Sequence, residues 1–263
     1  QKLAGQIAHL SRPCTLSVLG GDGTLNEVIN GLAQTEFSHV TLGYIPTGSG
    51  NDFARALNIS CDVEQCINAI LSPSQCTAVD IGLARTQENS RYFLVSSGIG
   101  YDADICRNVM VSPLKKAMNK IHLGKLTYVL IALKLLIQYK GCSVSIRMDK
   151  KEITSLTKFF FITGMNIPYE GGGVKFCPEA NFQDNLLDIC IIGKLSKLKI
   201  LALFPTAFLG KHGHFGGVTL TKCQRIDISS KAPLPIHCDG ESMGVADQLT
   251  LQSSQKQINV ILK

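Results

Sequence analysis

The stretch from Val18 to Leu32 constrains the fold more than any other part of the sequence. It continues an apolar run, Cys14–Leu19, that is short enough to be a buried strand. Glycine and polar residues follow without a break. Apolar residues then recur at the spacing of one helix face, at Leu25, Val28, Ile29 and Leu32. We therefore expect a strand, a glycine-rich turn and a helix, an arrangement whose free backbone N–H groups bind phosphate.

Asp22 is the unusual member of this turn, which reads Gly20-Gly21-Asp22-Gly23-Thr24. A carboxylate among phosphate-binding amides would repel the ligand unless it holds a divalent cation or takes a proton from an attacking hydroxyl. The pattern matches neither the dinucleotide fingerprint nor the Walker loop. A tight turn with no ligand is the alternative, but three glycines and an aspartate exceed what a simple turn requires.

A second strand, Val40–Ile45, runs into another glycine-rich segment, Pro46–Asp52. The carboxyl ends of parallel strands meet at one edge of a sheet, so both loops should face one crevice. Ser49 and Thr47 have hydroxyl groups that can donate to phosphate. Asn51 and Asp52 open the next helix, and helix capping alone is the alternative interpretation of this pair.

Length and composition favour a soluble globular protein with two domains, because 263 residues exceed one ordinary core and 17% of them are charged. The ten cysteines are scattered singly, without a Cys-x-x-Cys pair. This argues against zinc or disulfide frameworks and favours reduced thiols in a cytosol. The net charge of +6 fits an anionic membrane surface, a nucleotide or solubility alone. We expect no nucleic-acid partner.

The chain changes character along its length. Residues 1–10 have the pattern of a helix end with no strand before it, so the chain begins as though an N-terminal strand and helix preceded it. From Ala78 onward, short runs of alternating residues and glycine turns predict an antiparallel β-sandwich. The predicted strands are 81–84, 92–97, 142–148, 158–162, 187–192, 225–229 and 248–252. We thus predict a nucleotide-binding α/β domain over residues 1–77 and a β-sandwich domain over residues 78–252.

One helix that interrupts the second domain, Ile121–Lys140, carries an apolar face. It is not a membrane span, because Lys125 and Lys134 interrupt its apolar residues. Basic residues gather before and within it, at Lys115, Lys116, Lys120, Lys125 and Lys134. Lysines beside an apolar face suit peripheral contact with an anionic bilayer, and a solvated surface helix is the alternative.

Motifs across nearly the whole chain point to one family. The two glycine loops are followed by Val79-Asp80-Ile81-Gly82, by 93–103, and by Pro178-Glu179-Ala180 with Asp184; the last motif is Asp239-Gly240-Glu241. This set resembles the diacylglycerol kinase catalytic family of lipid kinases, which includes bacterial soluble diacylglycerol kinases and is related to sphingosine kinases. The resemblance implies a Rossmann-like, NAD-kinase-like parallel α/β domain followed by an antiparallel β-sandwich. It also implies that the tail 253–263 returns to the first domain.

The resemblance further implies a reaction and its residues. The chain would transfer the γ-phosphate of ATP, with Mg²⁺, to the hydroxyl of diacylglycerol or a similar lipid, giving phosphatidic acid. Glu241 would be the base, although relatives in the sphingosine kinase branch point to Asp22; Asp22 and Asp239 would lie near the catalytic metal. The expected cofactor-binding residues are Gly20, Gly21, Asp22, Gly23, Thr24, Asn26, Glu27, Gly48, Ser49, Asn51, Asp52 and Asp80. Spacing alone leaves a charged hairpin turn as an alternative at Asp239–Glu241.

A second metal site is expected in the loop 181–186. In close bacterial relatives this loop holds a structural magnesium, so Asn181, Asp184 and Leu186 become candidate ligands. Asn185 stands where the family usually has glycine, and asparagine tolerates the positive φ that such a turn requires.

Two other functions stay open at this stage. One is a soluble-substrate kinase of the NAD-kinase type, which would share Asp22 and its loop. The other is a catalytically silent nucleotide- or lipid-binding protein. For the lipid kinase we expect a cytoplasmic, peripherally membrane-associated protein, and the sequence leaves its oligomeric state open, a homodimer included.

Overall fold

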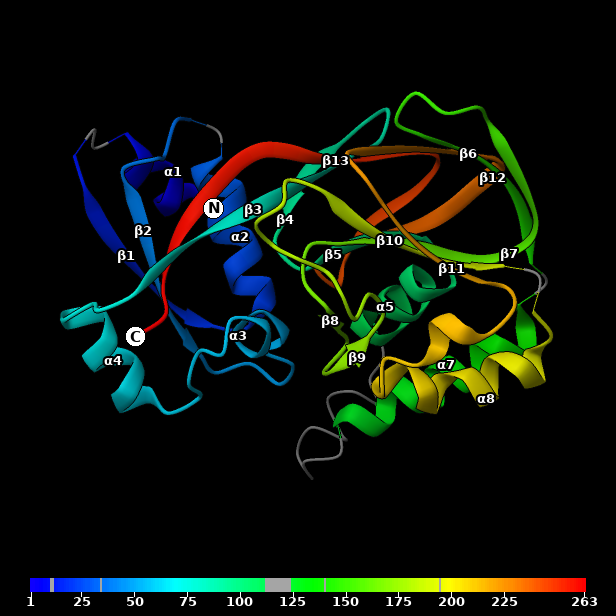
Figure 1. The fold of residues 1–263 in the computed structure, drawn as a ribbon, viewed down its shortest axis with the longest axis horizontal. Helices are drawn as coiled ribbons and strands as arrows, with labels where there is room; N and C mark the ends of the chain where they lie inside the picture. Colours follow the sequence, from blue (N-terminus) through cyan, green and yellow to red (C-terminus); the bar gives the residue numbers. More distant parts are fainter. Residues whose placement is uncertain (10–11, 34, 112–123, 140, 194) are drawn as a thin grey trace.

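The computed structural model describes residues 1–9, 12–33, 35–111, 124–139, 141–193 and 195–263. Its N-terminal part alternates helices and strands, as the sequence predicts (Figure 1). The elements are α1 (Lys2–Ala8), β1 (Cys14–Gly20), α2 (Asp22–Leu32), β2 (Val40–Pro46), α3 (Asp52–Ala56) and α4 (Val63–Leu71). β1 and β2 pair in parallel with Gly20 opposite Pro46. Both glycine loops therefore leave the same edge of the sheet.

The remaining elements build a mainly antiparallel layer, on the right in Figure 1. Its strands are β3 (Cys76–Arg85), β4 (Ser90–Phe93), β5 (Ser96–Gly100), β6 (Cys142–Met148), β7 (Thr154–Met165), β8 (Tyr169–Glu170), β9 (Val174–Lys175), β10 (Leu187–Gly193), β11 (Val218–Cys223), β12 (Arg225–Cys238) and β13 (Glu241–Ile261). Its helices are α5 (Tyr101–Val111), α7 (Gly124–Gln138), α8 (Lys197–Phe208) and the short 3-10 helix η1 (His212–His214). The predicted fold class, parallel α/β followed by a sandwich-like β domain, is confirmed.

β13 joins the two parts into one hydrogen-bonded sheet. Its first half pairs with β12, and its second half pairs with β3. Near its end, Asn259 and Val260 pair in parallel with Thr41 and Leu42 of β2, so the C-terminal strand runs back into the N-terminal sheet (Figure 1). The predicted boundary at residues 77/78 falls inside β3. We propose that β3 and β13 together form the connection between the two domains.

Three groups of buried side chains stabilise this arrangement. One fills the N-terminal part and includes Leu25, Ile29 and Val79. A second lies within the sandwich, around Phe93 and Ile162. The third packs α5, α7 and α8 against the outer face of β7 and β10. Two helices of this third group, α5 and α8, contribute Cys106, Phe204 and Phe208 to the cleft that the glycine loops also line.

The sequence pattern gave no bounds for α4, α5, α8, β8, β9 or β11, and it shortened β13. α8 was missed because its apolar residues occur on all sides, which leaves no 3.6-residue period to detect. β11 was missed, and the predicted strand 248–252 is only part of the 21-residue strand β13. The predicted helix 121–140 corresponds to α7, and residues 121–123 and 140 lie outside the described residues. Among the helices that the structure describes, none combines the length and apolar character needed to span a bilayer.

Candidate active site

The two predicted glycine loops are in direct backbone contact. The amide of Thr47 donates to the carbonyl oxygen of Gly20 at 2.8 Å. A Cβ atom on Gly48 would lie 2.6 Å from the Cα of Gly21, closer than any side chain tolerates. Glycine at these positions is thus required for the loops to meet, and their meeting forms one wall of a cleft.

Asp22 links the first loop to the helix that follows the second. Its carboxylate accepts hydrogen bonds from the backbone amides of Asp52 at 3.0 Å and Phe53 at 3.2 Å, so it caps α3 from outside. Burial raises the pKa of Asp22, although these N–H donors and the nearby Arg55 oppose the shift.

Asp52 receives its partners from both domains. Its carboxylate forms an ion pair with Arg55 and accepts a hydrogen bond from the amide of Gly172 at 2.7 Å. Burial raises the pKa of Asp52, and the neighbouring negative charge of Asp22 raises it further. Two carboxylates with raised pKa values and a shared guanidinium therefore lie side by side beneath the loops.

Gly172 belongs to a third glycine turn that sequence analysis missed. It connects β8 and β9, and its three glycines, Gly171, Gly172 and Gly173, all have positive φ angles of 66°, 86° and 113°. L-residues rarely adopt this conformation. The Arg55 guanidinium lies 5.6 Å from the ring centre of Tyr169 at the start of this turn. Three consecutive glycines are the sequence signal from which this turn could have been predicted.

The Asp239–Gly240 pair forms the turn between β12 and β13. Both residues have positive φ angles, 48° and 77°, and Cys238 pairs with Glu241, as in a two-residue type I′ hairpin. The turn geometry expected from spacing alone is thus present. It places Glu241 immediately after the turn, on the first residue of β13.

Asp239 is buried and its carboxylate is fully engaged. One oxygen accepts from the side-chain amide of Asn26 at 2.7 Å and from the amide of Leu94 at 3.0 Å. The other accepts from the amides of Val95 and Ser96, both at 2.9 Å. Burial raises the pKa of Asp239, and these four donors oppose the shift. These four donors occupy the carboxylate and hold it in place at the cleft. That Asp239 lies near the catalytic metal stays a prediction.

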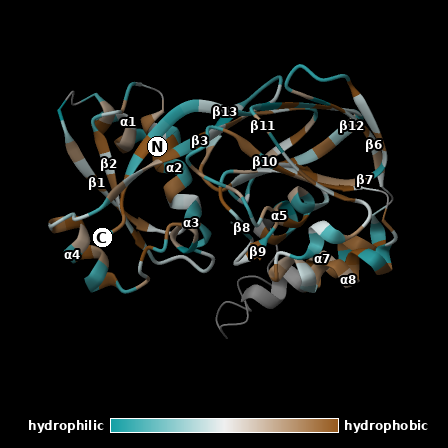
Figure 2. Ribbon diagram, viewed as in Figure 1, coloured by the Kyte–Doolittle hydropathy of each residue, from teal (hydrophilic) through white to brown (hydrophobic). Residues whose placement is uncertain are grey.

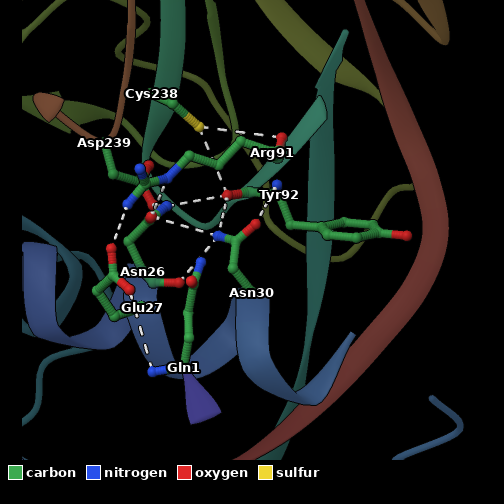
Figure 3. A network of polar contacts seen from close by, with 8 residues as sticks. All are labelled: Gln1, Asn26, Glu27, Asn30, Arg91, Tyr92, Cys238 and Asp239. Carbon is green, nitrogen blue, oxygen red and sulfur yellow. Dashed lines mark hydrogen bonds and ion pairs between the residues drawn. The ribbon is translucent and has the colours of Figure 1, made fainter. Parts of the chain in front are cut away.

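Asn26 and Glu27 belong to the network that holds Asp239 (Figure 3). Asn26 also donates to the carbonyl oxygen of Tyr92 and accepts from the guanidinium of Arg91 at 2.7 Å. Arg91 in turn forms a 2.8 Å ion pair with Glu27. These contacts tie α2 to β4 and to the β12–β13 turn. Asn26 and Glu27, two of the predicted cofactor-binding residues, therefore act on the site indirectly, through the network that holds Asp239.

The loops and turns enclose a cleft of about 350 Å³. Its predicted members are Gly21, Asp22, Gly23, Gly48, Ser49, Asp52, Asp239 and Glu241, and its other residues include Glu170, Gly172, Phe204 and Phe208. A Cβ atom on Gly23 would lie 3.2 Å from the Glu241 carboxylate, which places this carboxylate at the first loop. Predicted residues that do not line the cleft are Gly20, Thr24, Asn26, Glu27, Asn51 and Asp80.

Asp80 lies in a different environment. Its carboxylate accepts from the amide of Asn185 at 2.7 Å and from the side-chain amide of Gln257 at 2.6 Å. It therefore fastens the loop 181–186 to β3 and β13, and the prediction that it binds the cofactor is not supported by its position.

The loop 181–186 adopts the expected turn, with Asn185 at φ 55°. However, the Asp184 carboxylate pairs with the ammonium of Lys222 at 2.7 Å, and Lys222 also lies 3.3 Å from Asp188. The side-chain oxygen of Asn181 accepts from the amide of Gln183 within the loop. Lys222 thus places a positive charge at the loop where the sequence predicts a structural magnesium, and binding of that ion by Asn181, Asp184 and Leu186 stays a prediction.

A buried ionic cluster lies under the cleft. The Nε2 atom of His237 is 3.3 Å from the Asp102 carboxylate and 3.4 Å from that of Glu170. Burial would lower the pKa of His237, but the two carboxylates raise it to about 9. Burial raises the pKa of Glu170 to about 7. The cluster ties α5, β8 and β12 together, and no spacing pattern among the histidines pointed to it.

An apolar cavity of about 180 Å³ adjoins the cleft. It lies between α5, α7 and α8, and its lining includes Ile105, Ala132, Leu136, Phe161, Leu203 and Phe204. Phe204 lines both the cavity and the cleft. A polar, glycine-lined space and an apolar one therefore share a wall.

Comparison with known proteins first identifies the class. Residues 95–261 match the family described as "YegS C-terminal NAD kinase beta sandwich-like domain". The fold is also shared with an Archaeoglobus fulgidus NAD kinase solved with ATP, with a TM-score of 0.52, 11% identity, and coverage of 96% of this chain and 82% of that one. The molecule thus has the architecture of an NAD-kinase-like enzyme.

The family follows from the N-terminal part and from full-length relatives. Residues 1–84 match the diacylglycerol kinase catalytic domain. A Bacillus subtilis diacylglycerol kinase is 30% identical over 253 residues, which cover 92% of this chain and 78% of the relative. A second Bacillus subtilis protein, provisionally named as the lipid kinase YtlR, is 32% identical over 232 residues, or 87% of this chain and 74% of that protein. A Bacillus anthracis structure, provisionally titled a diacylglycerol kinase, has a TM-score of 0.73 at 26% identity and covers all of this chain and 83% of its own. The chain belongs to the diacylglycerol kinase catalytic family of lipid kinases.

Proposed function

We propose that this chain transfers the γ-phosphoryl group of ATP to the hydroxyl of diacylglycerol or a closely similar lipid, giving a phosphatidic acid-type phosphate monoester. The observation that carries the proposal is the shared wall at Phe204 between the polar cleft and the apolar cavity. An acceptor that carries a hydroxyl on an apolar body would occupy both spaces at once. A water-soluble acceptor of the NAD-kinase type would have no use for the cavity.

The glycine loops are suited to the phosphates of ATP. Gly21, Gly48 and Ser49 offer backbone and hydroxyl donors at one wall of the cleft. Gly172, which belongs to the second domain, is held opposite these donors because its amide donates a hydrogen bond to the Asp52 carboxylate. A triphosphate between these walls would contact both domains, which supports phosphoryl transfer within the cleft.

Asp22 and Asp52 are the residues that would hold magnesium. Their carboxylates both lie beside Gly50, whose added Cβ would be 3.4 Å from Asp22 and 3.7 Å from Asp52. Both pKa values are raised by burial, so a cation here would relieve an unfavourable concentration of charge. Oxygen-only ligands suit Mg²⁺. When bound, the ion would neutralise phosphate charge during transfer.

Glu241 is the candidate base. It borders the cleft beside Gly23, and its carboxylate accepts no hydrogen bond from the residues that the structure describes. Asp22, the alternative base, already accepts two backbone hydrogen bonds. Asp239 would act by positioning, because its four donors fix the turn that presents Glu241. In this assignment Glu241 takes the proton of the lipid hydroxyl as that oxygen attacks the γ-phosphorus and ADP leaves.

The cellular setting follows from the substrate and the thiols. None of the ten cysteines, all of which lie among the described residues, takes part in a disulfide bond, which fits a reducing compartment such as the cytosol. The acceptor would come from a membrane that the enzyme contacts peripherally.

The test is a phosphate-transfer assay with labelled ATP and mixed micelles that contain diacylglycerol, sphingosine or undecaprenol. We expect label in phosphatidic acid, loss of transfer on magnesium chelation, and recovery when magnesium is restored. Asp22→Asn should lose transfer, whereas Glu27→Gln, which alters a carboxylate outside the cleft, should retain it. Binding of ATP with no transfer to any lipid would instead support a silent binding protein.

A further inference from the structure

The helix α8 has an exposed apolar face in addition to its buried one. Its buried side is formed by Leu203, which packs in the third core, and by Ala207. On the opposite side, apolar residues that are 38–79% exposed recur at helical spacing, at Leu198, Leu201, Phe204 and Phe208. A helix with apolar residues on every side is expected to be buried in protein or membrane, and this one is buried on one side only.

The neighbouring helix α7 extends the same surface. Leu130, Leu133 and Ile137 are 45%, 38% and 75% exposed at the same kind of spacing. Both helices line the apolar cavity, through Leu133 and Leu201 among others, so they lie side by side. Figure 2 shows the two helices together below the sheet, with hydrophobic segments on both. We call the exposed apolar residues of α7 and α8 the helical face.

The sequence around this face is free of acidic residues. Residues 105–141, which include α7, and residues 193–217, which include α8, together contain eleven Lys and Arg and no Asp or Glu. The rest of the chain contains fifteen Lys and Arg against twenty Asp and Glu. The modest net charge therefore conceals a strong asymmetry. Lys197, Lys199 and Lys211 are exposed at the two ends of α8.

We propose that the helical face docks on an anionic lipid bilayer, with its leucine and phenylalanine side chains in the acyl region and its lysines at the lipid phosphates. The purpose of this docking, which is to bring the acceptor lipid to the cleft, rests on the proposed function. Charge complementarity selects the occupant, because an apolar face with lysines at the ends of α8, carried on stretches of sequence that contain no Asp or Glu, matches an anionic bilayer.

The position of the face gives the docking a consequence for catalysis. Phe204 and Phe208 lie on the helical face and also line the cleft that contains Asp22 and Glu241. A bilayer on this face would meet the cleft at its apolar edge. The acceptor lipid could then reach the base along α8 without crossing water, and its chains could remain in the apolar cavity.

Vesicle sedimentation tests this directly, without any catalytic readout. The intact protein should sediment with vesicles of phosphatidylcholine and phosphatidylglycerol at low salt, and much less with phosphatidylcholine alone or at high salt. Lys199→Gln with Lys211→Gln should weaken partitioning by about 25-fold, at about 5-fold for each lysine. Ile137→Glu with Leu198→Glu, at 75% and 79% exposed residues of the helical face, should abolish it. The matched controls Ile153→Glu and Lys231→Gln change an exposed apolar and an exposed basic residue outside α7 and α8, and they should bind like the unchanged protein.

The outcomes separate this inference from the proposed function. Transfer to a short-chain, monomerically dissolved diacylglycerol should survive in the Ile137→Glu/Leu198→Glu variant, because neither residue lines the cleft or the apolar cavity, while transfer to vesicle-borne lipid is lost. A protein without kinase activity that still binds anionic vesicles through these residues would contradict the proposed function alone. Vesicle binding unaffected by these variants would overturn the inference. So would a dimer in vesicle-free solution that the Ile137→Glu/Leu198→Glu variant converts to monomer, since a second copy would then cover the face.

Discussion

The two walls of the cleft are built on opposite principles. The N-terminal wall consists of glycine loops whose backbones contact one another and whose carboxylates are held by backbone amides. The wall formed by α5, α7 and α8 consists of aliphatic and aromatic side chains around an apolar cavity. The first wall tolerates almost no change in residue size, whereas the second depends on volume and apolar character. Phosphate handling and acceptor choice should therefore respond to different substitutions.

The largest effect is expected at the boundary between the walls. Glu241→Gln keeps the size of the side chain but removes its basicity, so kcat should fall about 10²- to 10⁴-fold. KM for ATP and the melting temperature should change little, because this side chain makes no hydrogen bond to the residues that the structure describes. Steady-state kinetics with dioleoylglycerol checks this. A fall of less than about threefold would remove Glu241 as the base and return the role to Asp22.

Asp239→Asn should act on the rigid wall through stability. The amide cannot accept all four hydrogen bonds that the carboxylate accepts, so buried donors lose their partners at a cost of about 3 kcal/mol. Denaturant unfolding measures this loss. Asp227→Asn, at an exposed ion pair with Arg225, should cost no more than about 1 kcal/mol. Equal costs in the two variants would contradict the anchoring role.

Ala132→Phe should act on the apolar wall alone. The added ring would occupy part of the cavity that Ala132 lines, so KM for a long-chain diacylglycerol should rise about tenfold. KM for ATP and turnover of a short-chain acceptor should stay unchanged. Ala132→Ser keeps the residue small and serves as the control. A matching loss with short-chain lipid would mean that the cavity does not hold the acyl chains.

The smallest effect concerns the ionic cluster between the walls. Both groups bind more protons in the folded state, because the pKa of Glu170 is raised to about 7 and that of His237 to about 9. Their contribution to stability is complete at low pH and is lost as the pH rises through these values. The melting temperature should therefore fall between pH 6.5 and 9, and His237→Gln should flatten this slope. An unchanged slope would show that His237 does not titrate as the geometry requires.

The difference between the two walls also explains which parts of the site could be predicted from the sequence. The rigid wall was predictable, because a backbone that must approach another backbone requires glycine at fixed positions, as at Gly21 and Gly48. The turn at Asp239 and Gly240 was predictable for the same reason. The full occupation of Asp239 was not, since its partners Leu94, Val95 and Ser96 donate through backbone amides, which carry no residue signal.

Most of the apolar wall could not be predicted from the sequence. α8 has no polar side to give it a period, and its neighbours in the cavity come from α5 and α7, far away in the chain. The ion pair at the predicted magnesium loop was not predictable for a similar reason, because Lys222 lies 38 residues from Asp184 and only the β10–β11 pairing brings them together. Lysines 115, 116 and 120, which were predicted to favour the membrane, lie outside the described residues.

The central claim is that both walls serve one reaction, transfer from ATP to a lipid hydroxyl. The most direct test incubates the intact protein with γ-labelled ATP, magnesium, dioleoylglycerol in anionic vesicles and an equal concentration of NAD. The account predicts label in the lipid phase as phosphatidic acid, and none in a phosphorylated dinucleotide. Label in the dinucleotide, or in neither acceptor while ATP remains bound, would contradict it.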